Sequence, residues 1–385
     1  MSNSIKIENM LSNKKQKVYD DLNNTYKHYK INNDTTDYIS DISDKLSSSV
    51  SSDSEIEIEI VLDNFIEPLL DSKNARENVY PIEYQDIYEY YKTHQSLFWT
   101  AAEVDLTKDL RDWDEKLNDD EKYYIKMILS FFAGSDFIVN EKEEKSQEEV
   151  KVLEYKWFTR DKIAREDVHS ISYANMIEAY INDPIEKEKL KHAIKTIPSI
   201  KKKADWFRKY INNDDFVKRE VASAITEGIY FSGSFCGIFW LKKRGLLPGL
   251  CDYNELISRD EGMHRDFSCM IYSKYIKRKL DENELLDMVK EAVDIEIEFC
   301  TESLPVKLIG MDHVSMIQYI KYVADKLLLL LIGKKYYNVV NPFEWMVYIS
   351  LLTNTDFFAH RPTSYSKQKN LTDSSENMIK FNEDY

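Results

Sequence analysis

Helix-breaking residues are scarce in this sequence, which has 385 residues but only 9 Gly and 8 Pro. Average composition would give a chain of this length roughly three times as many Gly. Because Gly and Pro are the residues that most often make turns, their scarcity predicts long helices with few connections. Hydrophobic residues make up 43% of the chain, which is sufficient for one large core or two modest ones.

Cysteine is also scarce, and basic residues are outnumbered by acidic ones. The four cysteines show no C-x-x-C spacing, which fits a reducing compartment. The N-terminal stretch MSNSIKIENM has no apolar core of the signal-peptide type, so we expect a cytoplasmic protein. The formal net charge of -16 repels nucleic-acid phosphates and anionic lipid, and we therefore expect no nucleic-acid partner.

One apolar run has the length of a membrane span. Residues 221–241 read VASAITEGIYFSGSFCGIFWL, and a bilayer-spanning helix needs about 20 such residues. However, Glu227 lies in the middle of the run, where a charge is costly in lipid, and small polar residues dilute it. A buried core helix with one functional carboxylate explains the same pattern, so we expect no membrane association.

The polarity of the chain divides it into three parts. Residues 1–63 are polar and contain the Ser- and Asp-rich stretch DISDKLSSSVSSDSEIEIEI, which predicts an N-terminal extension without stable structure. Residues 361–385 are again polar and predict a flexible C-terminal tail. Between them, residues 64–360 show helical spacing and predict one all-α domain. We expect helices over residues 82–98, 120–141, 164–181, 182–197, 221–241, 258–276, 281–304 and 313–332.

Two copies of Glu-x-x-His stand out within the predicted domain. Glu166 and His169 form the first copy, and Glu261 and His264 form the second. Residues three apart share one face of a helix, so each carboxylate and its imidazole point to the same spot about 5 Å apart along the axis. Each pair lies among apolar residues, which favours a buried metal site.

Two further predicted helices each carry one acid in an apolar run. Asp136 lies in ILSFFAGSDFIV, and Glu227 lies in residues 221–241. A lone buried carboxylate costs several kcal/mol unless it is paired, and neither segment holds a Lys or Arg that would neutralise its acid. Two divalent cations would neutralise all four carboxylates. This arrangement of single acids and Glu-x-x-His pairs is the pattern of di-metal carboxylate helical bundles.

Oxygen and nitrogen donors without a thiolate favour iron or manganese over a structural zinc ion. The alternative is that the six residues are scattered surface acids and two hydrogen-bonded core histidines. The chain order of single acid, pair, single acid and pair argues against that alternative.

Tyr173 shares the helix face of the first pair, because it lies four residues after His169. Phe231, Phe235 and Ile257 flank the acids Glu227 and Glu261 at helical spacing and would wall the tyrosine ring if the helices converge. Tyr173 is then either a core tyrosine with a hydrogen-bonded hydroxyl or a redox-active phenol oxidised by the metal pair. Spacing alone leaves both interpretations open.

Long stretches around these residues resemble the small, radical-generating subunit of class I ribonucleotide reductase, of the eukaryotic or viral type. The matching stretches include PIEYQDI at Pro81, FWTAAEVDLTKD at Phe98, FFAGSDFIVNE at Phe131, EGIYFSGSFCGIFWLKKRGLLPGL at Glu227 and NELISRDEGMHRDF at Asn254. The resemblance covers about residues 65 to 365 and the last few residues. It implies a ferritin-like helical bundle that forms a homodimer.

The resemblance also implies a role for individual residues. The family's two iron ions, joined by an oxo bridge, would be held by Asp136, Glu166, His169, Glu227, Glu261 and His264. The stable tyrosyl radical would form on Tyr173, in a pocket made by Phe231, Phe235 and Ile257. Trp99 and Asp260 would carry electrons toward His169, and Tyr365 would relay the radical toward the large subunit. The terminal KFNEDY, with Phe381, Asp384 and Tyr385, would dock on that partner.

Some residues depart from the family's pattern. Asp161, Lys162, Arg165 and Asp167 make the approach to the first Glu-x-x-His unusually charged, and Lys162 lies one turn before Glu166. A cation there would alter metal affinity or the potential of the tyrosine. The chain also ends in Tyr385 rather than Phe, which would retune docking.

Three hypotheses of function therefore remain. The first is the ribonucleotide reductase small subunit, in which a di-iron site activates dioxygen. The second is another di-iron helical protein, either an oxygenase or an iron store, which would need the metal site but not Trp99, Tyr365 or the tail. The third is a non-catalytic relative of the family, which would bind no metal.

Overall fold

A computed structural model describes residues 66–304, 311–343 and 345–346. The described residues form helices and connecting loops without a β-strand, as the sequence predicted. The predicted N-terminal extension, Tyr365 and the docking residues Phe381, Asp384 and Tyr385 lie outside the described residues. The domain boundaries at residues 63 and 360 therefore stay predictions.

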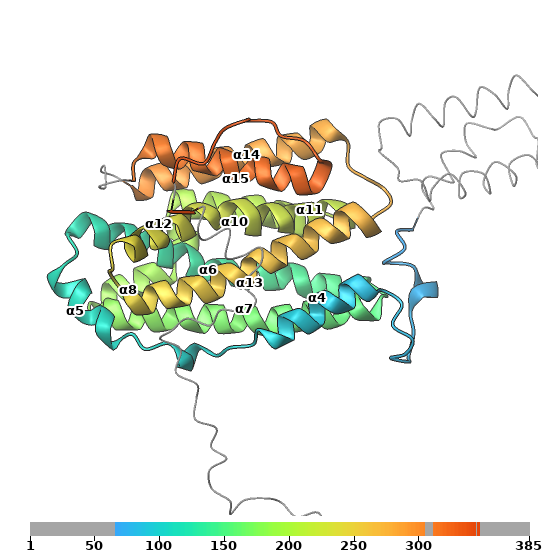
Figure 1. Ribbon diagram of the computed structural model, residues 1–385, viewed down its shortest axis with the longest axis horizontal. Helices are drawn as coiled ribbons and strands as arrows, with labels where there is room; N and C mark the ends of the chain where they lie inside the picture. The colour runs from blue at the N-terminus through green and yellow to red at the C-terminus, as the bar shows by residue number, and fades with distance from the viewer. Residues whose placement is uncertain (1–65, 305–310, 344, 347–385) are drawn as a thin grey trace, which may run out of the picture.

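Four long segments form the centre of the bundle and run roughly along its longest axis (Figure 1). They are α6 (Asp119–Glu149), α7 (Leu153–Tyr180), the α11–η3–α12 segment and α13 (Pro248–Met270). α6 packs on α7, α13 contacts both α7 and η3, and α11 contacts α6 and α13. The bundle interior therefore lies between elements that are far apart in the sequence.

The α11–η3–α12 segment contains the apolar run and differs from the single helix that we expected over residues 221–241. α11 (Phe216–Ile225) and α12 (Ser232–Lys243) are joined by the π-helical turn η3 (Thr226–Tyr230). A π turn places one extra residue in the helix and is frequent at functional sites. Here it holds Glu227.

The other helices cover this centre. α4 (Gln85–Ser96) packs on α7 and α13, and α10 (Pro198–Ile211) packs on α6 and α14 (Glu282–Ser303). α15 (His313–Ile332) lies beside α14 at one edge of the bundle (Figure 1). The short elements are η1 (Ser72–Asn74), η2 (Ala101–Glu103), α5 (Thr107–Glu115), α8 (Pro184–Lys191), α9 (Ala193–Thr196) and the π turn η4 (Ile271–Tyr275).

Local sequence explains where several helices begin and end. Asn118 caps α6 in a capping box with Glu121, and Asp281 accepts hydrogen bonds from the first turn of α14. The helix that we predicted over residues 182–197 is divided into α8 and α9 at His192. Within the described part of the chain, no helix combines the length and the apolar character needed to cross a bilayer.

Candidate metal centre

Six carboxylate and imidazole side chains meet inside the bundle. They come from α6, α7, η3 and α13, and each is at most 4% exposed. The six are the predicted metal ligands: Asp136, Glu166, His169, Glu227, Glu261 and His264. Each Glu-x-x-His pair lies on one continuous helix, α7 or α13, as its spacing led us to expect.

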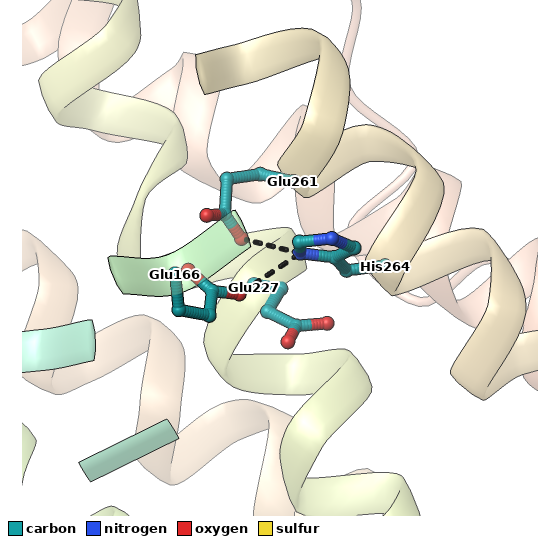
Figure 2. A group of neighbouring side chains, drawn as sticks. All are labelled: Glu166, Glu227, Glu261 and His264. Atoms are coloured by element: carbon teal, nitrogen blue, oxygen red, sulfur yellow. Dashed lines mark ion pairs between the residues drawn. The ribbon is translucent and has the colours of Figure 1, made fainter. Parts of the chain in front are cut away.

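The donor atoms fall into two overlapping groups. In one group, Asp136, Glu166 and His169 each offer an atom within 4.8 Å of the others; in the second, Glu166, Glu227, Glu261 and His264 do the same. Figure 2 shows the second group, in which the carboxylates of Glu166 and Glu261 approach the His264 ring. Glu166 belongs to both groups, so two ions held by these donors would share this residue.

The two carboxylates of the Glu-x-x-His pairs lie between the two imidazoles. The Nδ1 atom of His169 is 3.0 Å from Glu166 Oε2 and 3.1 Å from Glu261 Oε1. The Nδ1 atom of His264 is 3.0 Å from Glu166 Oε1 and 3.6 Å from Glu261 Oε2. Both histidines thus present the same ring nitrogen to the same pair of acids.

Several of these buried atoms make no hydrogen bond. They are Asp136 Oδ2, Glu166 Oε1, Glu227 Oε2, both carboxylate oxygens of Glu261, and His264 Nδ1. A buried polar atom without a partner costs about 1–3 kcal/mol, so a group of them in one place needs an explanation. Oxygen and imidazole donors that converge and leave several of their atoms without a hydrogen bond fit a site for two divalent cations.

The protonation equilibria of the site reflect its burial and its crowding. Burial raises the pKa of Asp136 and of Glu261 well above the usual carboxyl value, and the neighbouring Glu166 adds to the effect. Burial opposes ionisation of Glu166 too, but the imidazoles of His264 and His169 outweigh it and hold its pKa below the usual value. Burial lowers the pKa of His264 to about 3, which keeps its ring neutral, as a metal ligand must be.

Lys162 supplies a positive charge beside Glu227 that we did not expect from the sequence. We reasoned that no Lys or Arg in the segment of Glu227 would neutralise that acid, but Lys162 reaches it from α7 and donates to Glu227 Oε1. The same ammonium lies 2.7 Å from Glu143 Oε1. Burial raises the pKa of Glu227 to about 7, and Lys162 opposes that rise. The cation predicted near the site therefore contacts a candidate ligand directly.

Glu143 belongs to a buried group of charges beside the candidate site. Lys142 lies 3.3 Å from Glu143 Oε1 and 2.6 Å from Glu220 Oε1, and the hydroxyl of Tyr155 donates to Glu220 over 2.7 Å. Two lysines, Lys142 and Lys162, face two glutamates, Glu143 and Glu220, so this group is balanced by itself. Glu227 is left as the carboxylate whose charge a metal ion would balance.

Asp260 joins Trp99 to His169. The Trp99 Nε1 atom donates to Asp260 Oδ2 over 2.7 Å, and His169 Nε2 lies 3.3 Å from the same oxygen. The rings of Trp99 and His169 stack with centroids 5.9 Å apart. Arg165 and Arg259 also donate to Asp260. Although burial opposes ionisation of Asp260, these partners, with Arg259 the strongest, hold its pKa well below the usual value.

Tyr173 is 3% exposed and lies against aromatic rings. Its ring stacks on Phe132 with centroids 4.7 Å apart, and Phe132 in turn contacts Phe231 and Phe235 at 5.5 and 5.2 Å. Ile257 is buried in the same core. Burial raises the pKa of Tyr173 well above the usual value, and the charge of Asp136 adds to it. The phenol is therefore neutral, and the side chains around its ring are apolar.

Comparisons with known proteins agree on one family. Residues 76–342 match the family described as "Ribonucleotide reductase, small chain". The chain belongs to the ribonucleotide reductase small chain family. The family is the radical-generating subunit of ribonucleotide reductase, an oxidoreductase that works with a large subunit. This confirms the family that the sequence resemblance indicated.

Curated relatives cover most of the chain. The "Ribonucleoside-diphosphate reductase small subunit" of Dictyostelium discoideum is 50% identical over 307 residues, which are 79% of this chain and 90% of the relative. The "Ribonucleoside-diphosphate reductase subunit M2" of Homo sapiens is 47% identical over 322 residues, which are 83% of this chain and 82% of the relative.

Solved structures confirm the ferritin-like helical fold. The "Ribonucleotide Reductase Rnr4 Homodimer from Saccharomyces cerevisiae" has a TM-score of 0.68 at 34% identity and covers 76% of this chain and 92% of that chain. The "dimanganese(II)-NrdF" of Streptococcus sanguinis has a TM-score of 0.63, covering 72% of this chain and 99% of that chain. Its identity of 18% means that this second likeness bears on the fold alone.

Sequence reasoning missed two side chains beside the centre of this family member. Phe132 is the ring that stacks on Tyr173, although we named only Phe231, Phe235 and Ile257. His94 is completely buried on α4 and contacts His264. The sequence offers one indication that His94 is buried: it lies seven residues after Ile87, and this spacing places both residues on the same face of α4.

The other charged residues that depart from the family's pattern lie at different depths. Asp161 pairs with His94, and Arg165 donates to Asp260 and to backbone carbonyls of the α4 end. Asp167 accepts a 3.4 Å hydrogen bond from Asn140 at the surface. Three of the four therefore contact a candidate ligand or a residue that contacts one: Lys162 contacts Glu227, Asp161 contacts His94, and Arg165 contacts Asp260.

Proposed function

We propose that this chain holds two metal ions with the six candidate ligands and uses them to form a radical on Tyr173. The observation that carries the proposal is the convergence of six buried donors beside a buried phenol. The two groups of donors share Glu166, which suits a pair of ions rather than two separate sites. When bound, the ions would supply the oxidising chemistry, with dioxygen as the oxidant.

The charges of the chain support two divalent ions. Four carboxylates carry four negative charges, which two divalent cations balance, while the lysines beside Glu227 are balanced by Glu143 and Glu220. Hard oxygen donors with two imidazoles and no thiolate suit iron or manganese. We propose iron as the metal, with manganese as the alternative that metal analysis distinguishes.

The surroundings of Tyr173 suit a long-lived radical. Oxidation of a neutral phenol removes one electron and the hydroxyl proton together. Phe132, Phe231 and Phe235 surround the ring region with apolar groups, which exclude water and reductants from the oxidised ring. Asp136 is the charge that acts most strongly on the phenol, so it is the carboxylate best placed to affect the proton.

The contacts of Asp260 suit an electron path. Its Oδ2 atom accepts from Trp99 and faces His169, so this one carboxylate connects the indole to a candidate metal ligand. The two arginines on Asp260 hold its carboxylate in place. We propose that the radical then passes by Tyr365 to the large subunit, on which Phe381, Asp384 and Tyr385 dock, and that the chain works as a homodimer.

The test of this proposal combines metal analysis with electron paramagnetic resonance. Iron-loaded protein should contain two ions per chain and show a tyrosyl radical signal. Tyr173→Phe should keep both ions and lose the signal. Tyr180→Phe is the matched control, because Tyr180 is a second buried tyrosine on α7 whose hydroxyl donates to Asp109, and it should keep the signal. A signal that persists in Tyr173→Phe contradicts the proposal.

Activity with the large subunit tests the transfer residues. Trp99→Phe keeps a ring but removes the N–H that reaches Asp260, and deletion of residues 379–385 removes the docking segment. Both should retain two ions per chain while losing turnover. An oxygenase or an iron store would be unaffected by the deletion.

One observation favours a second candidate, a relative of the family that does not load both ions. Lys162 contacts Glu227, and an ammonium in that position competes with a metal ion for the carboxylate. Metal analysis separates the two candidates, because this one predicts fewer than two ions per chain.

A further inference from the structure

His94 connects a candidate metal ligand to a carboxylate at the edge of the bundle. Its Nε2 atom lies 2.9 Å from the Nε2 atom of His264, and its Nδ1 atom lies 2.6 Å from Asp161 Oδ2. His94 itself is completely buried, whereas the side chain of Asp161 is 23% exposed. The three side chains come from α4, α13 and α7, so the connection is built by tertiary packing.

When both rings are neutral, the hydrogen bonds of these three groups permit one arrangement of protons. The carboxylate of Asp161 only accepts, so Nδ1 of His94 donates to it. A neutral His94 then has no proton on Nε2, and this nitrogen accepts from the Nε2–H of His264. A neutral His264 with its proton on Nε2 has a free lone pair on Nδ1. That lone pair points to Glu166 and Glu261, where the metal donors converge.

The rest of the contacts of His94 hold its ring in place. The ring packs on Phe158 with centroids 5.4 Å apart and on His264 at 5.0 Å. Arg165 donates to the carbonyl oxygens of His94 and Leu97, over 3.3 and 3.0 Å, and so fixes the end of α4. Arg165, which the sequence marked only as an unexpected charge, thus supports the backbone that carries His94.

The two candidate histidine ligands are therefore supported in different ways. His169 faces the carboxylate of Asp260 directly, whereas His264 reaches the carboxylate of Asp161 through the ring of His94. Metal-binding histidines usually donate their second ring N–H to a carboxylate or carbonyl, and loss of that partner typically weakens metal binding by about 10- to 100-fold.

We propose that His94 and Asp161 are positioning residues that fix the ring and the tautomer of His264 for binding the second metal ion. The inference rests on the proposed function, because it assigns a role at the same metal centre. It concerns only the ion held by Glu166, Glu227, Glu261 and His264. The ion held by Asp136, Glu166 and His169 should be unaffected.

Three variants separate this role from simple packing. His94→Phe keeps a planar ring but cannot accept from His264. His94→Gln offers an amide oxygen as acceptor and should restore binding. Asp161→Leu removes the carboxylate that accepts from His94 Nδ1, so the proton of His94 is no longer held on Nδ1 and the acceptor of His264 is no longer fixed. His192→Gln is the control, because His192 is an exposed histidine that pairs with Glu188.

The measurement is Mn²⁺ binding to the metal-free full-length chain, followed by electron paramagnetic resonance of the free ion, with thermal melting as the check of folding. Wild type, His192→Gln and His94→Gln should bind two ions with similar affinity. His94→Phe and Asp161→Leu should weaken binding of one of the two ions by about 10- to 100-fold and leave binding of the other unchanged. Two ions bound with unchanged affinity in folded His94→Phe would overturn the inference and leave the proposed function standing. A wild-type chain that binds no metal would overturn the proposed function itself.

Discussion

Replacement of Lys162 by Gln should strengthen binding of one metal ion. The ammonium of Lys162 bonds Glu227 Oε1 and lies 2.7 Å from Glu143 Oε1, with all three side chains at most 4% exposed. An ion that binds Glu227 Oε1 must displace this ammonium, and an ion on the unpartnered Oε2 is repelled by its positive charge. Hydrogen bonds to charged groups contribute about 1.5–3 kcal/mol, and each 1.4 kcal/mol is about tenfold in affinity. Lys162→Gln should therefore tighten binding of the Glu227 ion by roughly 10- to 100-fold.

The same change lowers stability, because it leaves Lys142 to balance both Glu143 and Glu220. Removing one partner of a buried charge pair costs about 3–5 kcal/mol. The double variant Lys162→Gln/Glu143→Gln restores the balance of charge and is the matched control. It should recover most of the stability and keep the tighter metal binding.

Calorimetric titration of metal-free protein with Mn²⁺ measures the two affinities, and a thermal melt of each variant gives the stability. The direction of the effect is opposite to the one expected for His94→Phe, so the two experiments test different groups around the same ion. If folded Lys162→Gln and the double variant both bind Mn²⁺ no more tightly than wild type, the ammonium does not compete for Glu227 and the reasoning is wrong.

Two further predictions concern stability away from the metal ligands. A Cβ atom on Gly237 would overlap the hydroxyl and ring of Tyr124, so Gly237→Ala should destabilise the fold by about 1–3 kcal/mol, measured by denaturant unfolding, and an unchanged midpoint would contradict this packing. Burial raises the pKa of Glu296 to about 7 from its ordinary 4.5, against the pull of Lys203. The folded chain then holds more protons than the unfolded chain between about pH 4.5 and 7, so this carboxyl makes stability fall as pH rises through that window. Glu296→Gln should remove this part of the slope in melting temperature between pH 5 and pH 7.5, and an identical slope in both proteins would refute it.

The sequence was most informative where function depends on spacing along one helix. Glu166 and His169, like Glu261 and His264, lie three apart, and the helix geometry alone places each pair on one face. The single acids Asp136 and Glu227 were found because a charge in an apolar run needs a reason. Composition predicted the helical class for the same kind of local reason.

The sequence could not predict which residues of different helices come into contact. Lys162 and Glu227 are 65 residues apart, and His94 and His264 are 170 residues apart, so no local pattern predicts either contact. The π turn was missed because its extra residue leaves the composition of the apolar run unchanged. The division at His192 was missed because acidic and basic residues on either side fit one continuous helix equally well.

The π turn at Thr226–Tyr230 takes up one extra residue between α11 and α12. Loss of a single residue from this turn would restore regular winding and leave α12 in nearly its present phase relative to α11, so Phe235 would keep its place against the ring of Phe132. The side chain that would move is Glu227, which the wider turn now holds among the other donors. The segment should therefore accept many replacements of similar size but no shortening, and related chains that work by the same chemistry should keep its length.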